Sequence, residues 1–185
     1  MANGFFDAVF LALKSDLQDD EMLMVDSSSC RVHQHGSNPP GGQLANAMAR
    51  SCGGLSTKIH MACDALGYPL GFILTGANVS DYDQCKPLLK RHLKKGSFAL
   101  MDKGYDSDSI RSTVEALGAI SVIAPRSNRI VKPDFDKHTY KDRHRVENLF
   151  EKLKRFRRIA TRYEKLAATF SAMLILACSM VWMKM

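Results

Sequence analysis

Apolar residues along this chain follow two patterns, short continuous runs and longer stretches with a three- to four-residue step. The continuous runs predict buried strands, and they occupy residues 22–25, 56–65, 68–75, 98–101 and 120–124. The stepped stretches predict amphipathic helices, and they occupy residues 3–18, 81–95, 106–117 and 140–158. This order of elements is a mixed α/β pattern, and 185 residues suit one domain, 1–185.

One further stretch, 166–183, carries no charged side chain, and its 18 residues touch the lower bound for a membrane-spanning helix. It also contains three hydroxyl side chains and follows a helix that needs a core to pack on. We therefore predict a buried hydrophobic C-terminal helix at about 163–183, packed on a core of about 20–160, and no membrane anchor.

The predicted helix 140–158 has two faces. Its apolar stripe consists of Val146, Leu149, Phe150 and Leu153, and its polar face consists of Arg143, Glu147, Glu151, Lys154 and Arg158. Such a polar face is usually a solvated row of i,i+4 ion pairs. It also fits one wall of a metal-dependent phosphoryl-transfer site, and the helix alone leaves both interpretations open.

Charge is distributed unevenly along the chain. The net charge is +7, yet residues 126–165 hold 14 Lys and Arg against 6 Asp and Glu, so the remainder is close to neutral. A localised basic surface on an otherwise neutral domain is expected for a polyphosphate partner. The five cysteines are odd in number and include no C-x-x-C pair, which argues against a disulfide framework and fits a reducing cytoplasm.

Two predicted strands end in an aspartate, Asp26 and Asp102, and the helix at 140–158 presents Glu147. An aspartate after a strand is commonly just a turn residue. If these two strands are parallel neighbours, however, their ends lie only about 4.8 Å apart. Carboxylates gathered in this way are the ligands of two-metal phosphodiester chemistry, for which Mg²⁺ is suited.

Several motifs carry a family resemblance. Tyr140, Arg143, Glu147 and Lys154 reproduce the Y-(2)-R-(3)-E-(6)-K signature of transposases related to the fourth insertion sequence. V-D-S-S-S-C-R-V-H-Q-H-G and M-D-K-G-Y-D-S-D resemble the two aspartate motifs of the same proteins, and they begin at Val25 and Met101. Over about residues 20–180, the chain resembles the catalytic part of a bacterial insertion-sequence DDE transposase of the group named after the fifth insertion sequence.

The resemblance implies an RNase H-like fold, a mixed sheet flanked by helices. It implies that Asp26, Asp102 and Glu147 are catalytic and hold two Mg²⁺ or Mn²⁺ ions, and it selects Glu147 over Glu151. The implied reaction cuts DNA at the ends of an insertion element with an activated water. The freed 3′-hydroxyl then attacks a target phosphodiester.

The implied partner is double-stranded DNA, both element ends and target, bound by a homo-oligomer in the bacterial cytoplasm in association with the nucleoid. The candidate DNA-binding residues are Tyr140, Arg143, Lys154, Arg155, Arg158, Lys103 and Lys58. Cys52 departs from the family, which often has a basic residue there.

Relatives also carry an N-terminal region that recognises the element ends, and we expect this region to be missing here. The alternative to a transposase is therefore a catalytically silent DNA-binding fragment, a remnant or regulator of transposition.

Overall fold

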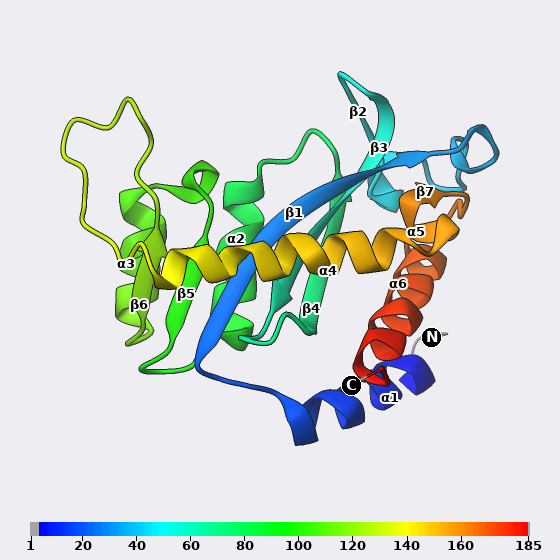
Figure 1. Cartoon of the computed structure of the whole chain (residues 1–185). Helices are drawn as coiled ribbons and strands as arrows, with labels where there is room; N and C mark the ends of the chain where they lie inside the picture. The colour runs from blue at the N-terminus through cyan, green and yellow to red at the C-terminus, as the bar shows by residue number, and fades with distance from the viewer. Residues whose placement is uncertain (1–3, 185) are drawn as a thin grey trace.

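The computed structural model describes residues 4–184, with the side chains of all of these except 15–17. A single mixed sheet runs through the middle of the molecule (Figure 1). Its seven strands are β1 (Met22–Val32), β2 (Ala49–Ser51), β3 (Gly54–Cys63), β4 (Pro69–Gly76), β5 (Phe98–Met101), β6 (Ile120–Ile123) and β7 (Thr161–Arg162). The five predicted strands correspond to β1, β3, β4, β5 and β6.

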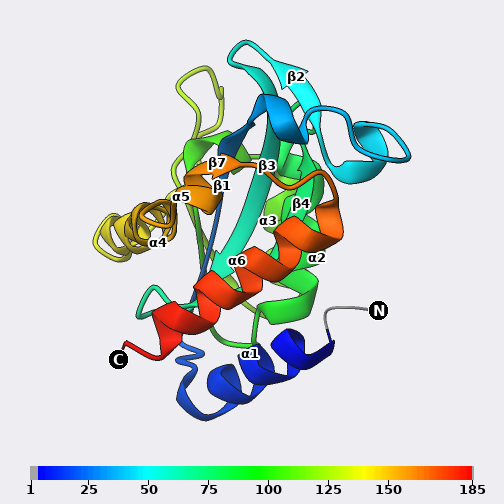
Figure 2. The same cartoon turned by 90° about the vertical axis from the view of Figure 1, so that its right-hand side faces the viewer.

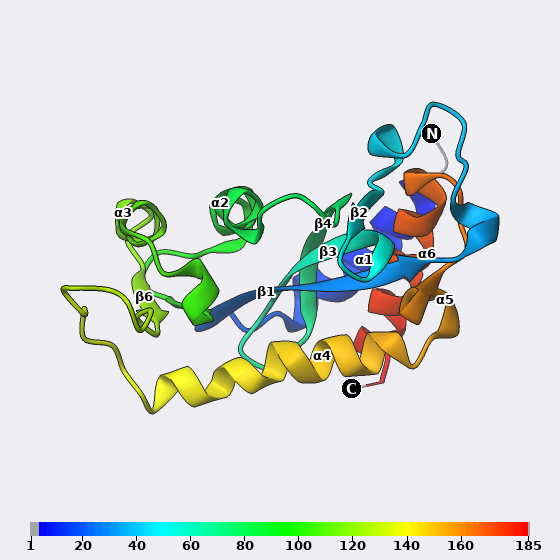
Figure 3. The ribbon, with the colours of Figure 1, turned by 90° about the horizontal axis from the view of Figure 1, so that it is seen from above.

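Helices cover both faces of the sheet. The α-helices are α1 (Gly4–Leu17), α2 (Asp81–His92), α3 (Asp108–Ala116), α4 (His144–Lys154), α5 (Arg157–Ala160) and α6 (Ala167–Trp182). Short 3-10 turns are η1 (Gln34–Gly36), η2 (Leu44–Asn46), η3 (Lys103–Tyr105) and η4 (Thr139–Arg143). Seen from above, α2 and α3 lie on one face of the sheet and α4 lies on the other (Figure 3).

The predicted helices 3–18, 81–95 and 106–117 correspond to α1, α2 and α3, although residue 3 lies outside the described residues. Ser80 caps α2 by accepting a hydrogen bond from the Tyr82 amide, as its position before the helix predicts. The helix α1 packs beside α6 at one end of the molecule (Figure 2).

The strand pairing explains how two distant aspartates meet. The long strands are hydrogen-bonded in the order β4-β3-β1-β5-β6, with β1 antiparallel to β3 and parallel to β5. Val25 of β1 is the register partner of Met101 of β5. Asp26 and Asp102 are the next residues, so they lie side by side. The condition for a shared carboxylate site, that their strands are parallel neighbours, is therefore met.

The expectation that the first strand ends at Asp26 is wrong, because β1 continues to Val32. Beyond Asp26 the neighbour β5 has ended, but the antiparallel partner β3 continues to pair, with Ser27 opposite His60 and Cys30 opposite Thr57. Ser27, Ser28 and Ser29 therefore belong to a strand and not to a turn, because their backbone pairs with that of β3.

The expectation of one helix over 140–158 is also wrong. The segment begins as the 3-10 turn η4, continues as α4 and leaves the helix at Phe156, whose φ of −76° and ψ of 111° are extended. Phe156 packs against the core and opens the separate short helix α5. Arg158 belongs to α5, so it does not share the α4 face with Glu147.

The helix α6 is the predicted buried C-terminal helix. Phe170, Leu174, Cys178 and Trp182 recur every four residues and are all buried. The Trp182 indole N–H donates a hydrogen bond of 2.9 Å to the carbonyl of Pro69, which ties the end of α6 to β4. No helix within residues 4–184 is both long enough and apolar enough to cross a membrane.

One buried cation, Arg162, joins parts of the chain that are far apart in sequence. Its guanidinium donates to the Asn46 carbonyl at 2.9 Å, to the Thr57 hydroxyl at 2.6 Å and to the Glu164 carbonyl at 3.0 Å. It also lies 5.0 Å from the centre of the Phe170 ring in α6. Arg162 therefore holds the loop before β2, the strand β3 and the helix α6 together.

Replacing Arg162 should destabilise the fold strongly. Arg162→Met leaves these buried acceptors without a donor, so we expect the free energy of unfolding to fall by about 3 kcal/mol or more. Urea unfolding followed by circular dichroism measures the change. Arg157→Met, at an exposed position on the adjacent helix, is the matched control and should change it by less than about 0.5 kcal/mol. Equal stability of the two variants would contradict this role.

Candidate active site

Two aspartates form the base of the site at the edge of the sheet. The Asp26 carboxylate is 21% exposed, and its Oδ1 accepts a 2.8 Å hydrogen bond from the Ser27 amide. Asp102 caps the turn after β5, where its Oδ1 accepts a 2.8 Å bond from the Gly104 amide. A Cβ on Gly104 would lie 2.8 Å from the same oxygen, so a larger residue at this position would displace the Asp102 carboxylate.

Glu147 approaches the aspartates from the first turn of α4. Its side chain is half exposed, and its Oε1 accepts a 2.8 Å bond from Arg143 Nη2. The other terminal nitrogen of Arg143 lies 3.9 Å from Asp26 Oδ2. The Arg143 guanidinium thus stands between Glu147 and Asp26 and makes a bridge from α4 to β1.

Arg143 is itself positioned by aromatic packing. Its guanidinium lies 5.8 Å from the centre of the Tyr140 ring, and Tyr140 meets Phe135 edge-on at 5.3 Å. The Nε of Arg143 is buried and finds no hydrogen-bond acceptor among the described residues. Tyr140 therefore supports the arginine, whose donors are only partly used.

The electrostatics of the site are dominated by burial of negative charge. Burial raises the pKa of Asp26 from its ordinary 3.8 to about 6; the Ser27 amide opposes this shift, Asp102 adds to it, Arg143 opposes it and Glu147 adds to it. The positive charge of Arg143 lowers the Asp26 pKa by less than burial, Asp102 and Glu147 raise it. Asp26 is consequently short of positive charge.

This donor set fits a divalent cation. The oxygen ligands that Mg²⁺ prefers lie on adjacent strand ends, and a bound cation would relieve the burial of the Asp26 charge. Among residues 4–184, no three His, Cys, Asp or Glu side chains are gathered closely enough to hold a metal ion as they stand. The Glu147 carboxylate faces Arg143, so closing the ligand set requires this ion pair to open.

The remaining predicted basic residues lie in three different surroundings. Lys154 belongs to the site, because its Nζ donates a 2.6 Å hydrogen bond to the Ser28 hydroxyl, two residues beyond Asp26 on the same side of β1. Lys103 immediately follows Asp102 and is exposed. The exposed side chain of Arg155 instead lines a separate cavity between α4 and α6.

Lys58 and Arg158 are already engaged by carboxylates. Lys58 is 14% exposed and pairs with Asp81, at the start of α2, at 3.0 Å. It therefore lies on the sheet face opposite α4. Arg158 donates a 2.7 Å bond to the buried carboxylate of Glu164. The structure does not bring these two residues together with the three carboxylates.

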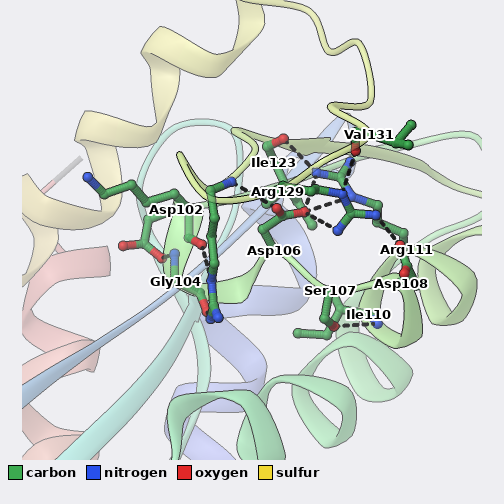
Figure 4. Close-up of polar contacts among 12 residues, drawn as sticks. Asp102, Gly104, Asp106, Ser107, Asp108, Ile110, Arg111, Ile123, Arg129 and Val131 are labelled. Atoms are coloured by element: carbon green, nitrogen blue, oxygen red, sulfur yellow. Dashed lines mark hydrogen bonds and ion pairs between the residues drawn. The ribbon is translucent and has the colours of Figure 1, made fainter.

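A buried aspartate at the start of the predicted helix 106–117, Asp106, has a structural role that the sequence analysis did not identify. Ser107 caps α3, while Asp106 accepts bonds from Arg111 at 2.9 Å and Arg129 at 3.1 Å (Figure 4). Its second oxygen accepts the Arg126 amide at 2.9 Å. Asp106 thereby fixes the start of the basic loop after β6. The signal in the sequence was an acidic residue next to an adequate cap, Ser107, with Arg111, Arg126 and Arg129 further along the chain.

The anchored loop extends the site beside Asp102. Arg126 donates to the carbonyls of Lys103 at 3.1 Å and Gly104 at 2.5 Å. Together with Ser127 and Asn128, these residues and Asp102 line an open cavity of about 560 Å³. The site is therefore a carboxylate edge with cations on both sides, from the loop and from α4.

Comparison with known proteins identifies a family. The sequence pattern of the transposase DDE domain matches residues 17–182. The chain is 37% identical over 131 residues to a transposase for insertion sequence element IS6501 of Brucella ovis, covering 70% of this chain and 100% of that protein. It is 35% identical over 135 residues to a transposase for IS402 of Burkholderia cepacia, covering 68% of this chain and 62% of that protein.

The fold is also that of a solved structure. The piggyBac transposase, in a synaptic complex with hairpin DNA, matches 94% of this chain with a TM-score of 0.56 at 12% identity. This chain spans about half of that protein, 48% of its length. The likeness confirms the predicted RNase H-like mixed sheet flanked by helices. With a family pattern that spans nearly the whole chain and relatives above 30% identity, this protein belongs to the transposase DDE domain family.

Proposed function

We propose that this domain cuts DNA at the ends of an insertion element and transfers the freed 3′-hydroxyl to target DNA. The observation that carries the proposal is the in-register pairing of β1 and β5, which places Asp26 beside Asp102 opposite Glu147. The spacing of Tyr140, Arg143, Glu147 and Lys154 supports a relation to transposases of the fourth insertion sequence, and we propose that the chain belongs among them to the group named after the fifth insertion sequence.

In this proposal Asp26, Asp102 and Glu147 hold two Mg²⁺ or Mn²⁺ ions. When bound, the ions would activate the attacking hydroxyl and offset the charge of the phosphodiester. Glu147 becomes available when Arg143 leaves its carboxylate, and the released guanidinium then donates to a DNA phosphate in bidentate fashion. Lys154 of α4 contacts Ser28, which lies on the same face of β1 as Asp26, and supplies a second phosphate contact.

The remaining predicted residues divide by their surroundings. We propose that Lys103 and Arg155, which are exposed, contact the duplex, whereas Tyr140 orients Arg143. Lys58 and Arg158 support the sheet and the turn after α5, because they pair with Asp81 and Glu164, away from the three carboxylates of the site.

We further propose that element ends and target are double-stranded DNA bound by a homo-oligomer, in the cytoplasm of a bacterium and in association with the nucleoid. The two named relatives come from bacteria. One observation favours the alternative, a silent DNA-binding fragment. The Glu147 carboxylate is paired with Arg143, and among the described residues it does not join the two aspartates in a metal-binding arrangement. A cleavage assay separates the two.

Glu147→Gln should lower cleavage of an element-end duplex on the order of 10³-fold, because a ligand and its charge are lost at the reacting phosphate. DNA binding should survive. The assay is product formation on labelled duplex with Mg²⁺, with and without chelator. Glu151→Gln, one turn along α4 and exposed, is the matched control and should cleave normally. Normal cleavage by Glu147→Gln would overturn its assignment, and wild type that binds without cutting would favour the silent fragment.

Asp26→Asn should stabilise the protein, with a defined pH dependence. The folded protein keeps the Asp26 proton up to about pH 6, while the unfolded chain loses it near 3.8. The free energy of unfolding therefore falls as pH rises through this window. A neutral amide at this position removes this loss. We therefore expect the free energy of unfolding of Asp26→Asn to exceed that of wild type by about 2–3 kcal/mol at pH 8 and by almost nothing at pH 3.5.

Urea unfolding at the two pH values measures this gain. Asp134→Asn is the matched control, because Asp134 also accepts a hydrogen bond from the following amide but is exposed. Added Mg²⁺ should stabilise wild type and not Asp26→Asn. A gain that is the same at both pH values would contradict the electrostatic origin.

A further inference from the structure

The helix α4 has two polar flanks, and the candidate active site uses only one of them. An α-helix turns about 100° per residue, so Lys154 lies about 20° round α4 from Glu147, whereas Lys152 lies about 140° from it. The buried stripe of α4, which includes Leu149 and Leu153, separates the two flanks. The Lys152 flank faces away from the aspartates, towards Tyr68 and α6.

A cavity of about 290 Å³ lies on this second flank, between the end of α4 and the end of α6. We call it the α4–α6 pocket, and its lining includes Tyr68, Phe156, Met180, Lys152, Arg155 and Lys184. Three of these side chains are cations, and no acidic residue of the described chain lines it. The pocket combines an aromatic and apolar wall with a positively charged rim.

The aromatic wall is rigid. Tyr68 stacks on Trp182 with ring centres 4.7 Å apart and planes 23° apart, and Trp182 is buried and hydrogen-bonded to Pro69. Lys152 Nζ lies 5.9 Å from the centre of the Tyr68 ring, a cation–π distance. The wall therefore holds its shape without an occupant.

The rim cations are available for a ligand. Lys152, Arg155 and Lys184 are exposed, and none forms an ion pair within the described part of the chain. By contrast Arg143, on the first flank, contacts the Glu147 and Asp26 carboxylates in this structure. Cations that are left unpaired beside an aromatic surface suit a backbone phosphate with its sugar or base against the ring.

We propose that the α4–α6 pocket is a second DNA-contact site, which binds backbone phosphates of a duplex away from the phosphodiester that reacts. The proposal rests on the proposed function. A DNA transferase handles an element end and a target, so one α4 flank can hold the reacting strand while the other holds a second stretch of duplex. The pocket recognises phosphate, which both duplexes supply.

The test uses Lys152→Gln/Lys184→Gln, with Lys90→Gln/Lys94→Gln as a control that removes the same charge from exposed positions at the end of α2. Two fluorescent duplexes of equal length serve as probes, one with the terminal sequence of the element and one of unrelated sequence. Binding is measured by anisotropy from 50 to 300 mM KCl. Circular dichroism verifies that both variants are folded.

We expect the pocket variant to bind about tenfold more weakly at 0.15 M salt, and its log Kd against log salt to lose a slope of about 2, one per phosphate contact. Loss on the terminal duplex alone assigns the pocket to the element end, and loss on the unrelated duplex alone assigns it to target DNA. The control variant should match wild type within about twofold.

Two results would overturn the proposal. One is an affinity and salt slope equal to those of the control variant on both duplexes. The other is unchanged DNA binding with an altered mass by light scattering, which would make the pocket a protein interface. Failure of the proposed function is distinguishable, because wild type would then bind neither duplex or, while binding, never cut one.

Discussion

The parallel pairing of β1 with β5 is the constraint on which the rest of this molecule depends. It sets Val25 against Met101, so that Asp26 and Asp102 lie side by side although 75 residues separate them. Parallel strands cannot be joined by a tight turn. The hairpin β3–β4 and the helix α2 lie between them in sequence and supply the crossover. The antiparallel partner β3 then holds β1 straight past the point where β5 ends, which keeps Asp26 on a rigid strand.

Holding Asp26 in a largely buried position has an electrostatic cost, and the basic residues around α4 reduce it. Burial raises the Asp26 pKa to about 6, so the charged form is kept at the expense of stability. Arg143 compensates only in part, since its Nη1 is 3.9 Å from Asp26 and its stronger contact is with Glu147. A site that is fully neutralised by its own side chains would have no affinity left for a cation. The incomplete compensation leaves negative charge at Asp26 that the proposed metal ions would offset.

Much of this arrangement could be predicted from the sequence, because burial and local spacing determined it. The apolar runs located the strands, and the register of Val146, Leu149 and Leu153 located the buried side of α4. The predicted end of β1 was wrong, because pairing with β3 outweighs the preference of serine for turns. The β3 residues that pair with β1 are distant in sequence, so they leave no signal in the local sequence around Asp26. Arg158 was misplaced for a related reason. Nothing in the helical spacing shows that Phe156 prefers the core to another helical turn.

The break at Phe156 has a consequence for function as well as for prediction. If α4 had continued, Arg158 would lie on the same side of the helix as Glu147 and Lys154. Instead the chain turns into α5, where Arg158 forms an ion pair with the buried carboxylate of Glu164. Phe156 lines the α4–α6 pocket together with Lys152. The same core contact that ends the helix therefore limits the first flank to Arg143 and Lys154. It also gives the second flank an aromatic wall, so one short helix presents two separate cationic surfaces.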